Sequence, residues 1–160
     1  MTSDGERRAV AALEASGVEF TLTRHGRVGS LEEAAAARGV TPGDIVKSLV
    51  VRRGDDDFLF VLVTGDRAIS WPKLRALLGV SRLSLPDAAT ALEVTGYERG
   101  TITPFGSLTA WPVVADERVV GRRVSIGAGA HGVAATLDGD ALVRTLGASV
   151  ADVTQDAPER

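Results

Sequence analysis

Apolar and polar positions along the chain repeat with two different periods, which predict a mixture of helices and strands. Five segments carry apolar residues three or four positions apart, the spacing of one face of a helix. Two of them open with a capping box, in which Ser3 precedes Glu6 and Ser30 precedes Glu33 by three residues. The predicted helices span residues 3–16, 30–37, 70–78, 87–94 and 140–146.

Runs that alternate between apolar and polar residues, or that are rich in β-branched residues, predict strands. The clearest hairpin joins residues 45–53 to residues 58–65 through the turn sequence GDDD. The polar tail, residues 154–160, is expected to fray. The predicted strands span residues 18–23, 45–53, 58–65, 111–115, 119–126, 133–137 and 150–153.

The order of these elements favours the α+β (mixed α/β) class. Strands outnumber helices in the middle of the chain and two strand pairs are linked by hairpins, so we expect a mixed or antiparallel curved sheet flanked by helices. A chain of 160 residues is long enough to bury about 70% of its unfolded surface. No repeat or linker divides it, and we therefore expect a single compact domain over residues 1–160, with its core at about 10–153.

Composition excludes several classes of protein. The chain has no cysteine, which excludes a disulfide scaffold, a cysteine nucleophile and a thiolate metal site. No apolar run approaches the roughly 18 residues of a membrane span, and the first residues lack the apolar core of a secretion signal. The cytoplasm is therefore the expected compartment. A net charge of -3 argues against a domain that coats nucleic acid.

Familiar catalytic motifs are missing or incomplete. With only two histidines, His25 and His131, the sequence favours no metal site, and it contains neither a G-x-S-x-G motif nor a phosphate-binding loop. Residues 127–132 match G-x-G-x-x-G, with Asp152 twenty residues further on. The sequence DGD soon after leaves little room for the helix that a dinucleotide site requires. We therefore predict a strand-to-strand bend, and a nucleotide-cofactor protein is the disfavoured alternative.

Two features remain as candidates for chemistry. The first is Lys47, one of two lysines among 18 basic residues, which lies in the apolar run IVKSLVV on the face of Ile45 and Leu49. A lysine there either extends its ammonium to solvent or is tuned for function, whereas Lys73 is expected on a solvated helix face. The second is the loop at residues 96–106. Its three glycines expose N–H groups that can bind an oxyanion or a phosphate, unless the loop is an ordinary surface connection.

The segments IVKSLVV and GYERGTITPFG, with the glycine-rich bend and the late helix followed by ADV, resemble the YbaK-like aminoacyl-tRNA deacylases. These are relatives of the editing domain inserted in bacterial prolyl-tRNA synthetases. The likeness runs from about residue 10 to residue 153. It implies a mixed α/β domain that hydrolyses the ester between a wrong amino acid and tRNA, commonly tRNA(Pro), without a metal or another cofactor.

The resemblance also implies roles for individual residues. The signature lysine falls on Lys47, and the G-x-x-x-P loop falls on residues 100–104. Lys47 would bind a phosphate or the aminoacyl carbonyl, and N–H groups of the loop and around Gly129 would hold the carbonyl oxygen. The implied catalytic residues are Lys47, Gly100 and Gly129. The implied substrate-binding residues are His25, Thr101, Ile102, Thr103, Pro104, Phe105, Gly127 and His131.

The chain departs from this resemblance at the bend. The cysteinyl-specific branch carries S-G-G-x-R-G, where this chain has Gly127 in place of the serine and His131 in place of the arginine. Alanine, serine and 2-aminobutyrate are therefore candidates for the edited amino acid alongside cysteine. A non-catalytic module of the same fold, binding an adenosine 3′ end or a synthetase, is the alternative function.

The expected partner is the 3′ end of an aminoacyl-tRNA, bound weakly and in a salt-sensitive way. A synthetase is a further candidate partner, whereas DNA and membranes are not expected. A local basic patch would suffice for one tRNA end. The candidates for it are the arginine pairs Arg24/Arg27, Arg52/Arg53 and Arg122/Arg123.

Overall fold

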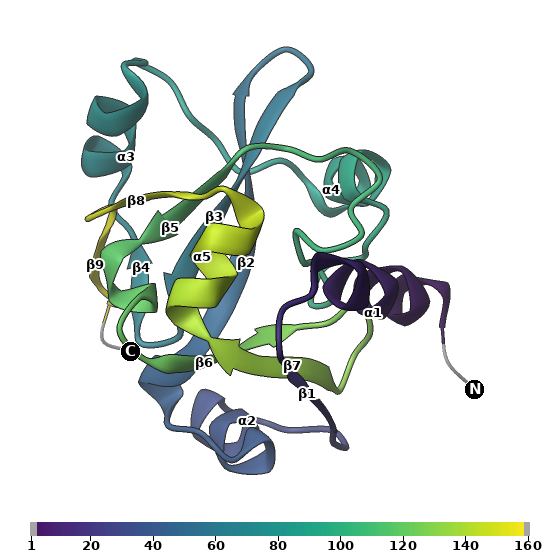
Figure 1. Ribbon diagram of the computed structural model, residues 1–160. Coiled ribbons are helices and arrows are strands. Elements are labelled where there is room, and N and C mark those ends of the chain that lie inside the picture. Colours follow the sequence, from purple (N-terminus) through teal and green to yellow (C-terminus); the bar gives the residue numbers. More distant parts are fainter. Residues whose placement is uncertain (1–2, 159–160) are drawn as a thin grey trace.

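The computed structural model describes residues 3–158, and its helices and strands largely follow the predicted order (Figure 1). Each α-helix begins after a side chain that accepts a backbone N–H, and each ends at a glycine in the left-handed conformation. The α-helices are α1 (Asp4–Ser16), α2 (Leu31–Arg38), α3 (Trp71–Leu78), α4 (Ala88–Thr95) and α5 (Gly139–Leu146). Single 3-10 turns form η1 (Pro42–Asp44) and η2 (Glu117–Val119).

Seven strands form one mixed sheet in the order β1-β7-β6-β2-β3-β5-β8. The β1/β7, β6/β7 and β2/β3 pairs are antiparallel, and the β2/β6, β3/β5 and β5/β8 pairs are parallel. A separate antiparallel pair joins β4 to β9. The strands are β1 (Thr21–Arg24), β2 (Ile45–Gly54), β3 (Asp57–Thr64), β4 (Arg67–Ile69), β5 (Val113–Asp116), β6 (Arg123–Gly127), β7 (Val133–Asp138), β8 (Ser149–Ala151) and β9 (Thr154–Asp156). The predicted α+β class and mixed sheet are confirmed.

Helices cover both faces of the sheet, so its central strands are buried on both sides (Figure 1). On one face, Leu13 of α1 and Leu142 of α5 share a core with Phe60 of β3. On the other face, Leu74 of α3 packs with Val61 of the same strand. Neighbouring residues of β3 therefore enter different cores, which explains why its sequence is an unbroken apolar run rather than an alternating one.

Strand boundaries differ from the prediction where a local turn competes with extension. The predicted strand at 119–126 begins only at Arg123, because the residues before it form η2 and its exit. The carboxylate of Asp116 caps that turn by accepting the N–H of Arg118 (3.1 Å). In addition, β1 and β5 begin two or three residues later than predicted, and β8 ends two residues earlier.

The prediction that the tail frays is wrong for Thr154–Asp156, which form β9 and pair with β4, a strand that the sequence pattern did not reveal. The side chain of Asp116 holds this C-terminal segment in place. Its fully buried carboxylate accepts the Val153 N–H (3.0 Å) and the Thr154 hydroxyl (3.0 Å). The last two residues of the predicted tail, 159–160, lie outside the described residues.

Lys73 belongs to this attachment of the C-terminal segment, rather than to a simple solvated face. Its Nζ donates to the Asp152 carboxylate (2.9 Å) and to the Thr154 carbonyl (2.9 Å). Arg118 donates to the same carboxylate from the other side (3.1 Å). The hydrogen bonds from Lys73 and Arg118 lower the pKa of Asp152 from 3.8 to about 2.

Replacement of Asp152 by asparagine is expected to reduce the dependence of stability on acid pH. The pKa of Asp152 is lowered in the folded state, so the ionised carboxylate stabilises the folded protein. This contribution to the free energy of unfolding is present above pH 3.8 and is lost as the pH falls toward 2. Urea unfolding should show Asp152→Asn less stable than wild type at pH 7, with the difference shrinking at pH 4 and again at pH 3. A difference that stays constant with pH would contradict the assignment.

Candidate active site

The sheet opens between β2 and β6. These parallel strands pair only at Ile45 with Ser125 and at Val46 with Ile126, after which β6 ends at Gly127. Beyond this point β2 continues alone on that side, although it remains paired with β3 on the other. The divergence leaves a gap in the sheet beside the first half of β2.

One edge of β2 has no backbone partner within this gap among residues 3–158. The Ile45 carbonyl accepts the Gly65 N–H (2.7 Å), so the backbone groups of alternate residues starting from Ile45 face β3. The intervening residues Ser48 and Val50 therefore turn their N–H and C=O groups toward the gap. Pairing on this side resumes only at Arg52, which exchanges backbone hydrogen bonds with residue 84. An exposed strand edge of this kind offers donors and acceptors to a ligand.

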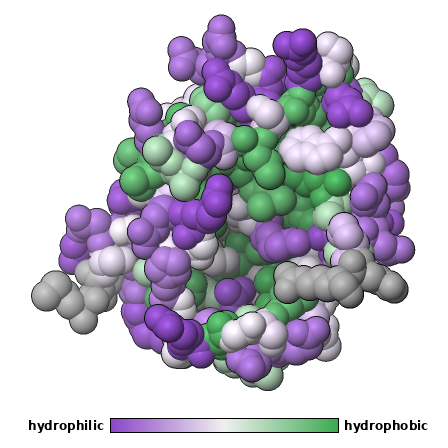
Figure 2. All heavy atoms as spheres, turned by 180° about the vertical axis from the view of Figure 1, so that it is seen from behind, coloured by the Kyte–Doolittle hydropathy of each residue, from purple (hydrophilic) through white to green (hydrophobic). Residues whose placement is uncertain are grey.

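A pocket of about 490 Å³ occupies the gap. Apolar side chains from β2, from the segment before α4 and from Ile102 form much of its wall, and Gly100 and Gly127 bring backbone to its surface. The charged residues that line it are Arg38, Lys47 and Arg99, with no acidic residue among the described lining residues. Figure 2 shows a recess on the rear face with apolar side chains along its upper side. The pocket therefore suits a ligand with an anionic group and an apolar or planar body.

Lys47 is positioned by strand alternation on the face of β2 that also carries Leu49. Its Nζ donates to the carbonyl of Arg67 (2.8 Å), at the start of β4. Burial lowers the pKa of Lys47, and the nearby charge of Asp66 partly opposes that shift. Lys47, one of the residues that line the pocket, thus carries a partly desolvated ammonium with one neutral hydrogen-bond acceptor.

The loop at residues 96–106, called the signature loop below, is held by its own side chains. The buried Tyr97 hydroxyl donates to the Phe105 carbonyl (2.6 Å), and the Thr101 hydroxyl donates to the Glu98 carbonyl (2.8 Å). The hydroxyl of Thr103 accepts the Phe105 N–H (3.2 Å). Thr101, Thr103 and Phe105 are buried, so their side chains shape the loop from within.

Only part of the predicted catalytic and substrate-binding set within this loop lines the pocket. Gly100 and Ile102 do so, whereas Thr101, Thr103, Pro104 and Phe105 do not. Pro104 stands at a turn of the loop, where its carbonyl accepts the N–H of residue 107 (3.4 Å).

Residues 127–132 join β6 to β7 as a bend, with the Ala128 N–H bonded to the Val133 carbonyl (3.0 Å). No helix follows the glycines, so the dinucleotide-site alternative is contradicted and the predicted strand-to-strand bend is confirmed. Gly127 lines the pocket, whereas Gly129 lies against α1, where an added Cβ would stand 2.3 Å from the Gly5 carbonyl oxygen.

Neither of the two histidines lines the pocket. His131 is largely exposed and its Nε2 lies 3.0 Å from the Glu98 carboxylate. A Cβ on Gly100 would approach the His131 ring to 3.0 Å, so this imidazole covers the outside of the signature loop. His25 anchors the bend, because its N–H donates to the Gly132 carbonyl (2.8 Å).

Comparison with known proteins identifies the architecture around this pocket. Residues 25–145 match the model of the family described as "Aminoacyl-tRNA editing domain". The chain belongs to the aminoacyl-tRNA editing domain family. The match contains β2, the signature loop and the bend, and α1 lies outside it.

Two proline–tRNA ligases and one solved structure are similar to this editing domain. The Bacillus licheniformis ligase is 34% identical over 79 residues, which is 49% of this chain and 14% of the ligase. The Heliobacterium modesticaldum ligase is 35% identical over 104 residues, covering 64% of this chain and 18% of the ligase. The solved structure, "Crystal structure of a putative trans-editing enzyme for prolyl tRNA synthetase", has a TM-score of 0.87 at 29% identity, with 97% of this chain and 99% of that chain covered.

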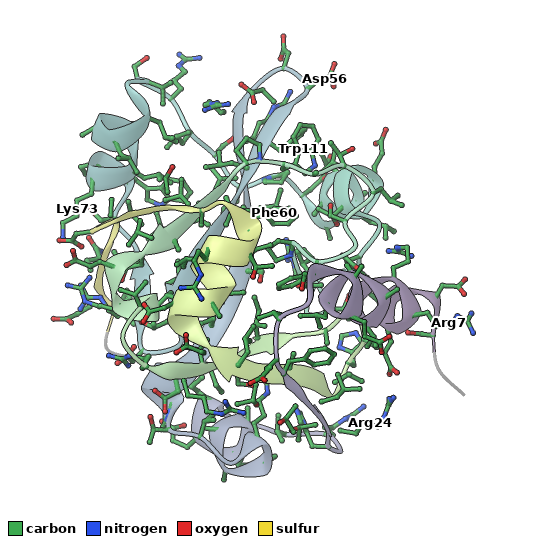
Figure 3. All side chains as sticks on the ribbon, viewed as in Figure 1. Arg7, Arg24, Asp56, Phe60, Lys73 and Trp111 are labelled. Atoms are coloured by element: carbon green, nitrogen blue, oxygen red, sulfur yellow. The ribbon has the colours of Figure 1, made fainter. Side chains whose placement is uncertain are left out.

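Four of the six candidate arginines for the basic patch form ion pairs with carboxylates. Arg24 forms an ion pair with Glu6, and Arg53 pairs with Asp57 at the β2–β3 hairpin. The hairpin tip at Asp56 and Arg24 lie at opposite ends of the molecule (Figure 3). Arg52 and Arg122 also have carboxylate partners, Asp55 and Asp44. Local acidic residues therefore neutralise most of the predicted patch.

The sequence analysis missed two cations of the pocket, Arg38 and Arg99. Arg38 is the last residue of α2, where a basic side chain is usual because it favours the helix dipole. Arg99 lies inside the signature loop, next to Gly100. Neither position differs in sequence from an ordinary surface arginine, and only the tertiary structure brings both to the gap beside β2.

Within residues 3–158, no group of three or more histidine, cysteine, aspartate or glutamate side chains is placed to hold a metal ion. Over the same residues, no helix combines the length and the apolar character needed to cross a membrane.

Proposed function

We propose that this editing domain is a trans-editing deacylase, which hydrolyses the ester between a small wrong amino acid and the 3′ end of tRNA. The observation that carries the proposal is the pocket between β2 and β6, where Lys47, Gly100 and Gly127 meet a free strand edge. Family membership and the similarity to proline–tRNA ligases favour tRNA(Pro) as the carrier. Alanine, serine and cysteine are the first amino acids to test.

The reaction needs donors for the oxygen that becomes negative when water attacks the ester carbonyl. In our proposal, the Lys47 ammonium and the free N–H groups on the edge of β2 supply positive charge and hydrogen bonds there. Gly100 and Gly127 allow the ester to approach the backbone, because they place no side chain between it and the wall. Thr101, Thr103, Pro104 and Phe105 keep the loop in shape.

The proposed hydrolysis balances without another reactant. Water adds its oxygen to the acyl carbon, the bond from that carbon to the ribose oxygen breaks, and the ribose oxygen takes a proton. The products are the free amino acid and tRNA with an intact 3′ end. No carboxylate or imidazole is among the described residues that line the pocket. We therefore assign the proton of the attacking water to the substrate's own unprotonated amino group, or to a relay in which the neighbouring ribose hydroxyl takes this proton and passes its own to the departing ribose oxygen.

A deacylation panel tests the proposal directly. Purified protein is incubated with tRNA(Pro) charged separately with alanine, serine, cysteine, threonine and proline, and the remaining ester is measured over time. We expect at least one of the alanine, serine and cysteine esters to be cleaved 10-fold or more faster than the proline ester. Such a ratio corresponds to the roughly 1–3 kcal/mol that a pocket gains or loses per methylene.

Cleavage of none of these esters would overturn the deacylase assignment. Binding of charged tRNA without turnover would instead support the non-catalytic module of the same fold.

A further inference from the structure

The side chain of Arg38 is a half-buried cation that the structure leaves without a counter-charge. It extends from the end of α2 to the pocket and donates a long hydrogen bond to the buried hydroxyl of Ser125 (3.5 Å). Its Nε is buried and has no hydrogen-bond partner among the described residues. Burial alone lowers the pKa of Arg38. A guanidinium has five N–H donors, so one weak contact within the protein leaves the others for solvent or a ligand, and the buried Nε is unsatisfied.

Three other basic side chains near the sheet have a hydrogen-bond or ion-pair partner. Lys47 binds the Arg67 carbonyl and is close to the charge of Asp66. Arg67 pairs with Asp156, and Arg118 pairs with Asp116 and Asp152. Arg38 forms no ion pair with any residue between 3 and 158. A desolvated cation without an anion is costly, and this cost is offset when a ligand brings the anion.

A second unpartnered polar atom belongs to another residue that lines the pocket. The Ser48 hydroxyl is buried and has no hydrogen-bond partner among the described residues, although Ser48 lines the pocket. Two such groups on different elements, α2 and β2, indicate that the pocket is built for a ligand with several acceptor oxygens. A phosphate group has these oxygens, and the planar fork of an arginine matches them in a bidentate way.

The chemistry of the proposed substrate identifies the anion that Arg38 would bind, and this identification rests on the proposed function. Esterification removes the charge of the amino acid's carboxylate, and the side chains of alanine, serine and cysteine are predominantly neutral at physiological pH. The only anions left near the scissile ester are the phosphates of the tRNA 3′ end. We propose that Arg38 binds the phosphate on the 5′ side of the terminal adenosine, with Ser48 within the same pocket as a further donor, while Lys47 serves the ester.

Binding of small probes tests this inference separately from turnover. Adenosine 5′-monophosphate and adenosine differ only in the phosphate, and both can be titrated against the whole protein by NMR chemical-shift changes. Wild type is expected to bind the monophosphate about 10- to 100-fold more tightly than adenosine, the range given by one or two charge-assisted hydrogen bonds. Arg38→Gln should remove this preference, and Arg38→Lys should retain only part of it because it keeps the charge but loses the fork.

Arg144→Gln is the matched control. Arg144 is also the basic residue in the last turn of an eight-residue helix, but it lies on α5 and does not line the pocket. The Arg144→Gln variant should keep the wild-type preference for the monophosphate. In deacylation assays Arg38→Gln is expected to raise KM about 10-fold or more with a smaller change in kcat, and thermal unfolding should show that the variant is folded.

Two results would overturn the inference: equal affinity of wild type for the two probes, or an unchanged preference in a folded Arg38→Gln variant. If wild type prefers the monophosphate but cleaves no ester of the panel, the phosphate site stands and the deacylase assignment fails. If it cleaves an ester and shows no preference, the deacylase assignment stands and the phosphate site fails.

Discussion

Lys47→Met is expected to lower the deacylation rate by about 100-fold or more while leaving the protein at least as stable as wild type. A positive charge placed at a developing oxyanion is typically worth a rate factor of this order. Methionine fits the position sterically, because its neighbours on this face of β2 are the apolar residues Leu49 and Val51. Single-turnover deacylation and urea unfolding of the same preparation measure the two effects.

The stability side of this prediction follows from the direction of the Lys47 pKa shift. Burial lowers the pKa below the ordinary value of 10.5, so the charged form destabilises the folded state at neutral pH. Methionine removes this cost but also the hydrogen bond to the Arg67 carbonyl, so the expected net gain is about 1 kcal/mol or less. The gain is largest below the lowered pKa and disappears as the pH rises above 10.5, where lysine becomes neutral in both states.

Lys73→Met is the matched control, since Lys47 and Lys73 are the two lysines of the chain. Lys73 lies outside the pocket and binds Asp152, so its loss should reduce stability and leave the deacylation rate unchanged. We therefore expect Lys47→Met to lower activity without a loss of stability, and Lys73→Met to lower stability without a loss of activity. A folded Lys47→Met variant with the full wild-type rate would contradict the role assigned to Lys47.

The sequence predicted the elements whose signals are local. Helix α1 begins after the Ser3 cap and ends at Gly17 because both signals lie within a few residues of the helix ends. The β4/β9 pair was missed because nothing in the polar tail shows that Asp116, far away in the chain, will bind Thr154. The position of the C-terminal segment depends on this buried carboxylate, and the sequence alone does not show that the assembled sheet brings the two together.

The candidate site divides in the same way. Lys47, Gly100 and Gly127 were selected by their motifs, and the fold brings these three to one pocket. Arg38 and the free edge of β2 could not be found in the sequence, because both depend on where the β2/β6 pairing stops. The pairing stops where the bend after β6 begins, and residues of the signature loop line the gap beyond it. These segments are far apart in the sequence and meet only in the folded protein.

Gly129→Ala is expected to destabilise the protein by roughly 3 kcal/mol or more and to reduce deacylation at least 10-fold. Gly129 has a φ of +87°, and an added Cβ would lie 2.3 Å from the Gly5 carbonyl oxygen of α1. Because that contact involves backbone, either α1 or the bend must move. The bend includes Gly127 at the pocket wall, so the displacement is transmitted to the site.

Gly121→Ala separates the two causes of this effect. Gly121 has a similar φ of +77° but nothing within 4 Å of the added Cβ, so its substitution carries only the cost of the left-handed conformation, about 1 kcal/mol. The excess loss of stability in Gly129→Ala therefore measures the contact between α1 and the bend, and Gly121→Ala should keep the wild-type deacylation rate. Equal losses of stability in the two variants, measured by urea unfolding, would show that α1 does not hold the bend. That result would contradict the inference that the shape of the pocket depends on α1, a helix outside the family match. The inference rests on the close approach of Gly5 in α1 to Gly129 in the bend.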